Sequence, residues 1–330
     1  MKKYQAKSPC CGVKVNRFGL RRRQCFVCKK TWRIRKKKTG RKRKIIKKNL
    51  VIEFLEHAIP TQRFLAKKRR LSNSTIQRDM TLSLNRFLKV TPWPTVPNQE
   101  EMIAVADAMV VYKKEQWHTW YFILVRPVIG GEAVILPPFH RVGTEVAKGW
   151  QEAFAKLPEG LLGSIKALVC DGHSGLVYET KFRNWPIQRC HFHLIARIQS
   201  RRSKWKSSQH FEEGKRIYDL VKTILTTKSE KTLTKNVSII EEIGWSMESK
   251  GLRAVLLGFV NSAEDFRTYL RLPKLHLPTT SNTAESLIGY IQSVSKRAKG
   301  FRTLVSMNNW ICAAIKHKKK IICNGFYQPS

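Results

Sequence analysis

Acidic residues are scarce in this chain. Its 330 residues include 23 Asp and Glu against 63 Lys and Arg, which gives a formal net charge of +40. Residues 1–48 contain 21 Lys and Arg and no acidic residue, and residues 49–330 contain 42 against 23. This balance excludes an acidic-tail protein or a neutral hydrolase. A charge of this size acts through many phosphate contacts and counterion release, so DNA or RNA is the expected partner and an anionic membrane surface is second.

Long apolar runs are absent as well. No stretch approaches the roughly 18 apolar residues that a membrane helix needs, and no apolar signal-peptide segment follows the basic N-terminus. We therefore expect no membrane partner and a cytoplasmic, nucleoid-associated protein. Hydrophobic residues make up 42% of the chain, which is enough for a packed core. At roughly 100–200 residues per domain, the length predicts two or three domains.

Four of the eight cysteines gather near the N-terminus, which favours a metal site over disulfides in a reducing compartment. Residues 1–35 place two cysteine pairs on either side of a short strand-turn-strand stretch, as in a structural zinc ribbon. The predicted zinc ligands are Cys10, Cys11, Cys25 and Cys28. An ordinary ribbon would have cysteine where Ser8 stands. The alternative is that Cys10 or Cys11 is a buried thiol, and that any metal has three cysteines plus water or His57 as ligands.

Residues 36–90 predict a basic linker followed by a pair of helices. Residues 36–48 are of low complexity and basic. Within residues 49–90 the pattern breaks at residues 71–73, where Ser72 or Asn73 can cap a second helix. This outline is typical of a helix-turn-helix, and its alternative is an ordinary amphipathic helix pair with a solvated basic face. The second helix would offer to a major groove Thr75, Gln77, Arg78 and Thr81.

Residues 91–99 contain three prolines and predict a rigid linker, after which the pattern changes to α/β. A first part of the core spans residues 100–193, a basic helical insertion 194–275, and a C-terminal core helix with a basic tail 276–330. Strands are expected over 102–113, 118–128, 132–137, 164–172 and 185–190, with a helix over about 144–157. Ser281 and Asn282 are capping candidates for the helix that follows them.

Three carboxylates stand out by their context. Asp107 lies inside an apolar strand, Asp171 ends another strand, and Glu285 lies in the first turns of the last amphipathic helix. A charge inside an apolar strand is costly unless it is paired or bound to metal. Oxygen ligands from three elements suit Mg²⁺ or Mn²⁺, and a pair of such ions supports in-line displacement at phosphorus. Taken singly, each carboxylate is equally explained as an edge cap, a turn residue or a residue favoured at a helix N-terminus.

The order of these elements resembles the ribonuclease-H-like core of DDE transposases. The match is closest around the second carboxylate, where Asp171-Gly172-His173-Ser174-Gly175-Leu176 is followed by Cys190-x-x-His193. This segment is similar to the Mutator-type transposases of bacterial insertion sequences, in which the second Asp precedes Gly-x-x-Gly-Leu and then Cys-x-x-His. Residues 282–286 and 296–302 resemble the family's segment around the catalytic Glu. An N-terminal zinc ribbon is unusual in the family, so the chain resembles a zinc-binding variant.

The resemblance implies the fold, the site and the partners. The fold would be a ribonuclease-H-like α/β core with a helical insertion, preceded by a zinc ribbon and a helix-turn-helix. Asp107, Asp171 and Glu285 would be the catalytic residues and the magnesium ligands, and Cys190 with His193 would lie behind them or position DNA. The alternative for that pair is a buried thiol beside a histidine at a helix start. Further DNA contacts are expected from Lys296, Arg297, Lys299 and Arg302.

The implied function is that of a DNA transposase. It would bind the terminal inverted repeats of a mobile element, cut with Mg²⁺ or Mn²⁺ and join the ends to target DNA, as a homodimer or larger assembly on double-stranded DNA. The competitors are a DNA-binding regulator with an inactive core and a metal-dependent nuclease that cuts without joining.

Aromatic and histidine residues near these elements complete the expectations. Trp205 and Trp245 in the insertion suggest stacking with an unpaired base, and core packing is the favoured alternative. His173 and His191 flank the carboxylates, but local hydrogen bonding or solvation is the commoner state of such histidines. We therefore leave both out of the predicted catalytic set.

Overall fold

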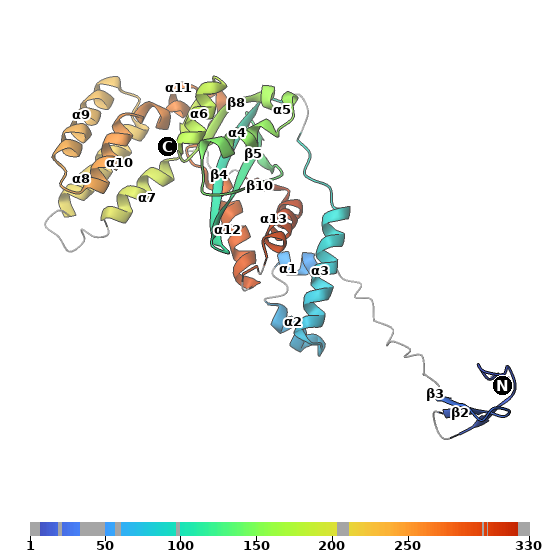
Figure 1. Cartoon of the computed structure of the whole chain (residues 1–330). Helices are drawn as coiled ribbons and strands as arrows, with labels where there is room; N and C mark the ends of the chain where they lie inside the picture. Colours follow the sequence, from blue (N-terminus) through green and yellow to red (C-terminus); the bar gives the residue numbers. More distant parts are fainter. Residues whose placement is uncertain are drawn as a thin grey trace. The chain divides into compact units, whose positions relative to one another are not determined.

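The computed structural model describes residues 7–18, 22–33, 50–56, 61–96, 100–202, 211–298, 300–301 and 303–322. The chain divides into two compact units, residues 1–48 and residues 49–330, and each is described by itself (Figure 1). Within the described ranges, no helix has the length and apolar character needed to cross a membrane.

The N-terminal unit contains a small antiparallel sheet. Its strands are β1 (Val15–Arg17), β2 (Arg22–Cys25) and β3 (Thr31–Arg33), in the order β1-β2-β3. Because β2 is paired on both sides and ends at Cys25, the turn that carries the second cysteine pair starts from a fixed strand end. This sheet agrees with the strand-turn-strand stretch expected between the cysteine pairs.

A mixed sheet forms the centre of the second unit, in the order β10-β6-β5-β4-β8-β9 with β7 paired to β5. Strands β4, β5 and β6 are antiparallel, whereas β8 and β9 run parallel to β4. The β4–β5 turn places Lys114 and Glu115 at positive φ of 50° and 62°, the conformation favoured in two-residue hairpins. The bounds are β4 Met102–Lys113, β5 Gln116–Pro127, β6 Glu132–Ile135, β7 Phe139–Val142, β8 Ile165–Cys170, β9 Ile187–Arg189 and β10 Lys320–Ile322.

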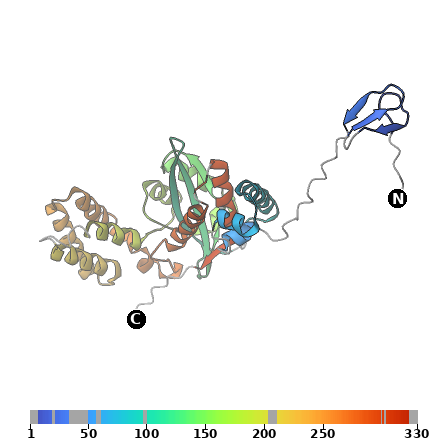
Figure 2. The same cartoon turned by 90° about the horizontal axis from the view of Figure 1, so that it is seen from below.

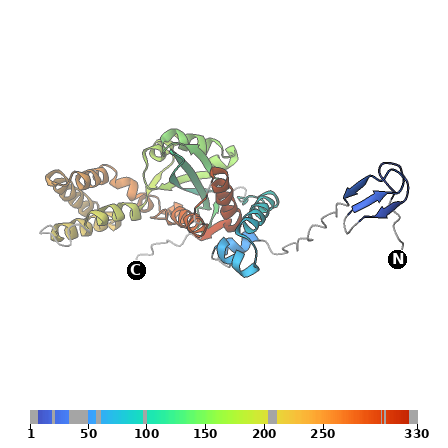
Figure 3. The same cartoon turned by 60° about the horizontal axis from the view of Figure 1, so that its bottom comes forward.

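Helices cover both faces of this sheet (Figure 3). Ala104 and Ala106 of β4 belong to the apolar cluster that includes Trp150 and Phe154 of α4. Side chains alternate between the faces of a strand, so Asp107 lies on the opposite face, toward α12, which packs on β4 and β5. The helices of the two layers are α4 Ala147–Ala155, α5 Glu159–Ser164 and α6 Ser174–Phe182 on one side, and α12 Asn282–Arg297 and α13 Leu304–Lys318 on the other.

Three helices precede the sheet: α1 (Leu50–Leu55), α2 (Gln62–Arg69) and α3 (Asn73–Val90). The Ser72 hydroxyl accepts a hydrogen bond from the backbone N–H of Thr75, so Ser72 is the cap of α3 and the helix starts at Asn73. Helix α3 packs on α13, and the buried Lys316 Nζ donates to the carbonyls of Leu88 and Thr91 at 2.8 and 2.7 Å. The helix pair is therefore attached to the C-terminal helices of the same unit.

A group of helices between β9 and α12 lies to one side of the sheet (Figure 2). It has an apolar core of its own. Helix α7 contributes Leu194 and Ile198 to that core, and α10 contributes Leu252 and Leu256. The group is joined to the sheet at β9, where Gln188 Nε2 donates to the Phe266 carbonyl at 2.9 Å. Its elements are α7 His191–Arg202, α8 Phe211–Thr226, α9 Glu230–Ser246, α10 Lys250–Val260, the 3₁₀ helix η2 Ala263–Phe266, α11 Thr268–Arg271 and the 3₁₀ helix η3 Pro273–Leu275.

Candidate functional site

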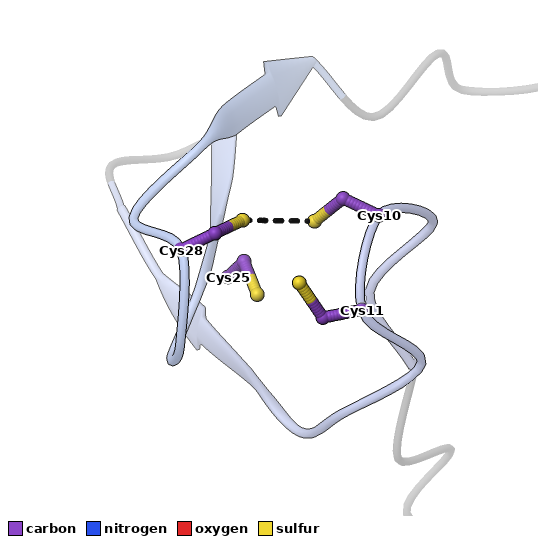
Figure 4. Close-up of side chains that lie close together, drawn as sticks. All are labelled: Cys10, Cys11, Cys25 and Cys28. Carbon is purple, nitrogen blue, oxygen red and sulfur yellow. Dashed lines mark hydrogen bonds between the residues drawn. The ribbon is translucent and has the colours of Figure 1, made fainter.

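The four N-terminal cysteines meet in one cluster (Figure 4). Their Sγ atoms all lie within 4.8 Å of one another, and Cys10 Sγ and Cys28 Sγ are 3.3 Å apart. Cys10 and Cys11 are both exposed, which excludes the alternative that one of them is a buried thiol. His57, the other alternative ligand, lies outside the described residues. Four sulfur donors at this spacing fit a structural Zn²⁺ ion.

Ser8, which stands where a ribbon would have cysteine, supports the cluster without being a ligand. Its side chain is buried, and its Oγ accepts hydrogen bonds from the backbone N–H groups of Cys11 at 3.3 Å and Val13 at 3.2 Å. Ser8 Oγ is also hydrogen-bonded to Cys25 Sγ at 3.4 Å, which lowers the pKa of Cys25 to about 6. The neighbouring thiols, Cys28 first, raise the pKa of Cys11 to about 12. A bound cation would favour the thiolate form of all four cysteines.

Asp107 and Asp171 occupy neighbouring positions in the sheet. Val105 of β4 is paired with Val169 of β8 in parallel register, so two residues further on Asp107 and Asp171 follow on the same face. Burial raises the pKa of Asp107 to about 7, and the charges of Asp171 and Glu285 add to this rise, whereas the hydrogen bond from Ala108 N–H opposes it. The three predicted carboxylates therefore interact electrostatically.

The turn after β8 fixes the position of Asp171. Its Oδ1 accepts a hydrogen bond from the backbone N–H of His173 at 2.8 Å. Gly172 has a φ of +88°, and a Cβ at this position would clash with the Arg189 guanidinium. Glycine is thus required both for the backbone conformation and for the close approach of Arg189 to the turn.

Glu285 is held by residues from the end of β9 and the start of α7. Ser281 Oγ donates a hydrogen bond to Glu285 Oε1 at 3.0 Å, Cys190 Sγ donates to the same oxygen at 3.8 Å, and His193 Nδ1 lies 3.4 Å from it. The buried Cys190 Sγ also accepts the backbone N–H of Ser281 at 3.2 Å. Ser281 occupies the N-cap position of α12 as expected, but its hydroxyl binds Glu285 rather than a helix N–H.

Cys190, His193 and Glu285 form a second cluster with ligand atoms within 4.8 Å of one another. The pKa of His193 is raised to about 9, first by its hydrogen bond with Cys190 and further by the charges of Glu285 and Asp171, against the effect of burial. Asp107 and Asp171 are not part of this cluster, and within the described residues their carboxylate oxygens do not form such a group with Glu285.

Glu145, which the sequence analysis did not single out, lies near this group. Its Oε1 accepts a hydrogen bond from Trp150 Nε1 at 2.8 Å and lies 3.4 Å from His173 Nδ1. Burial raises the pKa of Glu145, and the charge of Asp171 adds to the rise. No local pattern marks this residue, because its surroundings come from the turn after β8 and from α4.

His191 has a structural contact instead, since its Nε2 donates to the Phe266 carbonyl at 2.7 Å.

The predicted DNA contacts on α3 face a cavity. Gln77, Arg78 and Thr81 are exposed, whereas Thr75 is half-buried. Gln77 and Thr81 line a cavity of about 680 Å³, whose other wall includes Asn309 of α13. This face of α3 is therefore bounded by the C-terminal helices.

Of the four predicted contacts after Glu285, Lys296 is exposed on α12. The Arg297 guanidinium lies 4.8 Å from the Phe54 ring centroid and donates to the Phe54 carbonyl, which ties α12 to α1. Burial lowers the pKa of Arg297. Its observed role is thus a contact inside the protein. Lys299 and Arg302 lie outside the described residues.

Of the two tryptophans of the insertion, the structure describes Trp245. Trp245 at the end of α9 is 65% exposed, so the expectation that it packs in the core is wrong. It lines none of the cavities at the carboxylates. Trp205 lies outside the described residues.

Comparison with known proteins gives one family. A family model described as "Transposase, Mutator family" matches residues 130–317, more than half of the chain. The match includes Asp171, Cys190, His193 and Glu285, and it begins after Asp107. A search of curated proteins found no match.

Proposed function

Because the chain belongs to the Mutator family of transposases, we propose that it binds the terminal inverted repeats of a mobile element and catalyses metal-dependent cleavage and strand transfer of DNA. The observation that carries this proposal is the placement of three carboxylates on one face of the sheet: Asp107 and Asp171 follow in register on β4 and after β8, and Glu285 is on α12, which packs on β4. They are far apart in the sequence and share one face of the sheet. A transposase family implies DNA as substrate and a divalent metal as cofactor.

The strand order supports a ribonuclease-H-like core. Three antiparallel strands, β6-β5-β4, are followed by two strands, β8 and β9, parallel to β4, with helices on both faces. In this arrangement Asp107 lies on the central strand, and Asp171 follows the next strand along the sheet.

The carboxylates of Asp107, Asp171 and Glu285 would hold Mg²⁺ or Mn²⁺, which would activate the attacking oxygen and stabilise the leaving oxygen. Cys190 and His193 act on Glu285. Cys190 binds both the start of α12 and the carboxylate, and His193 supplies positive charge beside it. The Cys-x-x-His motif thereby positions the third carboxylate, whose own helix begins 92 residues after Cys190, at Asn282.

DNA recognition is assigned to the remaining basic parts. The four-cysteine unit would be a zinc ribbon, and Lys296 would be a further DNA contact. Helices α2 and α3 would be a helix-turn-helix that reads the inverted repeat in the major groove through Thr75, Gln77, Arg78 and Thr81. Synapsis of two element ends requires at least two subunits, so we propose a homodimer or larger assembly on double-stranded DNA. The place of action would be the cytoplasm, in association with the nucleoid.

The test is cleavage and joining of a labelled duplex that carries the element's own ends, with Mg²⁺ or Mn²⁺. The parent chain is compared with Asp171→Asn and Glu285→Gln, and with Glu159→Gln on α5 as a control carboxylate. We expect the two site variants to lose both activities by at least about a thousandfold while binding the duplex normally. Equal activity in the variants, or none in a folded parent, would favour a regulator, and cleavage without joined products would indicate a nuclease.

A further inference from the structure

A pocket lies at the end of β8, between Asp171 and the helical group that follows β9. Its volume is about 290 Å³. Asp171 lines one end, and the floor includes Arg189 and Phe266. Helix α7 forms one wall and α10 the other, two helices that pack against each other. The pocket is thus continuous with the carboxylate site and is bounded by the insertion.

The wall from α7 is cationic. His193 and Arg197 are one helical turn apart, so their side chains project from the same face of α7. Arg197 is exposed, and His193 contacts Glu285 as described above. Arg189 and Arg197 together bring two positive charges to the pocket, beside the carboxylates of Asp171 and Asp265.

The Arg189 guanidinium has hydrogen-bond partners for only some of its nitrogen atoms among the described residues. Its Nη1 donates to Ser262 Oγ at 2.5 Å, and the guanidinium lies 4.8 Å from the Phe266 ring centroid. Its Nε is buried without a hydrogen-bond partner among the described residues. Burial lowers the pKa of Arg189, although nearby acidic groups favour its charged form. The Nε atom lies against Gly172 of the turn after β8, so the guanidinium is fixed beside Asp171 and contributes its charge to the pocket that it lines.

The pocket wall formed by α10 consists of apolar residues, two of which are small. Ala254 and Gly258 are one turn apart on the same face, and Val255 and Phe259 border them. A Cβ built at Gly258 meets no atom within 4 Å, so glycine is not required by packing and its small size leaves the pocket open. Glycine inside a helix is less favourable than alanine, which is an additional reason to connect Gly258 with the space that it leaves.

We propose that this pocket holds a single unpaired nucleotide of the DNA strand at the cleavage site. Its phosphate would meet Arg189 and Arg197, and its sugar and base would lie against the α10 wall. A pocket of about 290 Å³ is too small to admit a DNA duplex. The proposal rests on the proposed function and adds a substrate requirement, namely that the strand is unpaired where it passes Asp171.

The test fills the pocket and follows both the chemistry and the base. Gly258→Leu and Ala254→Leu place a side chain in the open space, Gly258→Ala changes the helix propensity with little added volume, and Gly163→Leu on α5 is a matched control at an exposed glycine with equal room. Single-turnover cleavage of the element end is measured for each chain. The same duplex carries 2-aminopurine at each nucleotide beside the cleavage position in turn, because this base fluoresces more strongly when it is unstacked.

We expect the parent chain to raise the fluorescence at one position, and Gly258→Leu and Ala254→Leu to remove that rise and slow cleavage at least about tenfold. Gly258→Ala and Gly163→Leu should cleave within about twofold of the parent. A parent that cleaves while the two leucine variants at the pocket keep its rate and fluorescence would overturn the pocket proposal alone. A folded parent that cleaves nothing would instead overturn the proposed function.

Discussion

The two clusters of ligand-type side chains in this molecule are built in opposite ways. The four cysteines of the N-terminal unit lie within 19 residues of sequence, from Cys10 to Cys28, and are held by two turns at a small sheet. The second cluster joins Cys190 and His193 to Glu285, more than 90 residues later in the chain, and it needs the sheet, α7 and α12 to form. The first cluster has little apolar core around it, whereas the second is set among buried side chains. We infer that metal maintains the fold of the first and that the fold maintains the geometry of the second.

Removal of metal should therefore affect the two units very differently. We expect Cys25→Ser, or chelation by EDTA, to unfold residues 7–33, since binding of structural zinc in small units contributes on the order of 10 kcal/mol to folding. The thermal unfolding of residues 49–330 should change by less than about 2 °C. Metal content by mass spectrometry and amide NMR signals measure the first effect, and calorimetry the second. Matched loss of structure in both units would contradict the comparison.

Burial of the Asp107 carboxyl should make the free energy of unfolding depend on pH. The pKa of Asp107 in the folded chain, about 7, lies above its ordinary value of 3.8. The stability that this carboxyl contributes is complete below pH 4 and is lost as the pH rises through 7. Without divalent cations, the stability advantage of Asp107→Asn over the parent should grow by a few kcal/mol between pH 4 and 8, at about 1.4 kcal/mol per pKa unit.

Denaturant unfolding at several pH values measures this difference, and Asp219→Asn on the exposed face of α8 is the control. The control should differ from its parent by a constant amount. Mg²⁺ at pH 8 should reduce the advantage of Asp107→Asn, because a bound cation stabilises the ionised carboxylate. A constant difference for Asp107→Asn across the pH range would show that the carboxylate is not desolvated.

The contacts of Cys190 separate positioning from packing. Cys190→Ala removes the partner of the Ser281 N–H and of Glu285, and we expect the cleavage rate to fall about 10- to 100-fold with duplex affinity unchanged. Cys190→Ser keeps a hydrogen-bonding atom and should recover most of that loss. The control is Cys170→Ala, which removes a thiol that is just as buried from the adjacent strand. Equal losses in Cys170→Ala and Cys190→Ala would reduce the role of Cys190 to packing.

The features that depend on neighbouring residues could be predicted from the sequence, whereas the contacts between distant residues could not. The cysteine pairs, the cap at Ser72 and the strand that carries Asp107 could all be read from neighbouring residues, because turns, caps and strand alternation depend on nearby sequence. Glu145 was missed because its neighbours belong to other elements. The contact of Arg297 with Phe54 could not be predicted either, because an arginine in a basic run gives no sign of a partner 243 residues earlier.

The smallest expected effect concerns Ser8, whose substitution tests whether the cysteine cluster depends on hydrogen bonds around it or on the metal alone. The Ser8 hydroxyl contacts the cysteine turns through hydrogen bonds with two N–H groups and with Cys25 Sγ. Ser8→Ala leaves the two N–H groups without this partner, at a cost of about 1–2 kcal/mol, while all four sulfur atoms remain. Zinc should therefore still bind in a one-to-one ratio, with roughly tenfold weaker affinity in a competition with a chromophoric chelator.

Ser8→Cys offers a fifth thiol at the same place. An unchanged zinc ratio and an unchanged tetrahedral cobalt spectrum would show that Cys10 and Cys11 together complete the ligand set. If Ser8→Ala instead abolished binding, the turn would depend on this hydroxyl as much as on the metal, and the contrast between the two clusters would lose its basis.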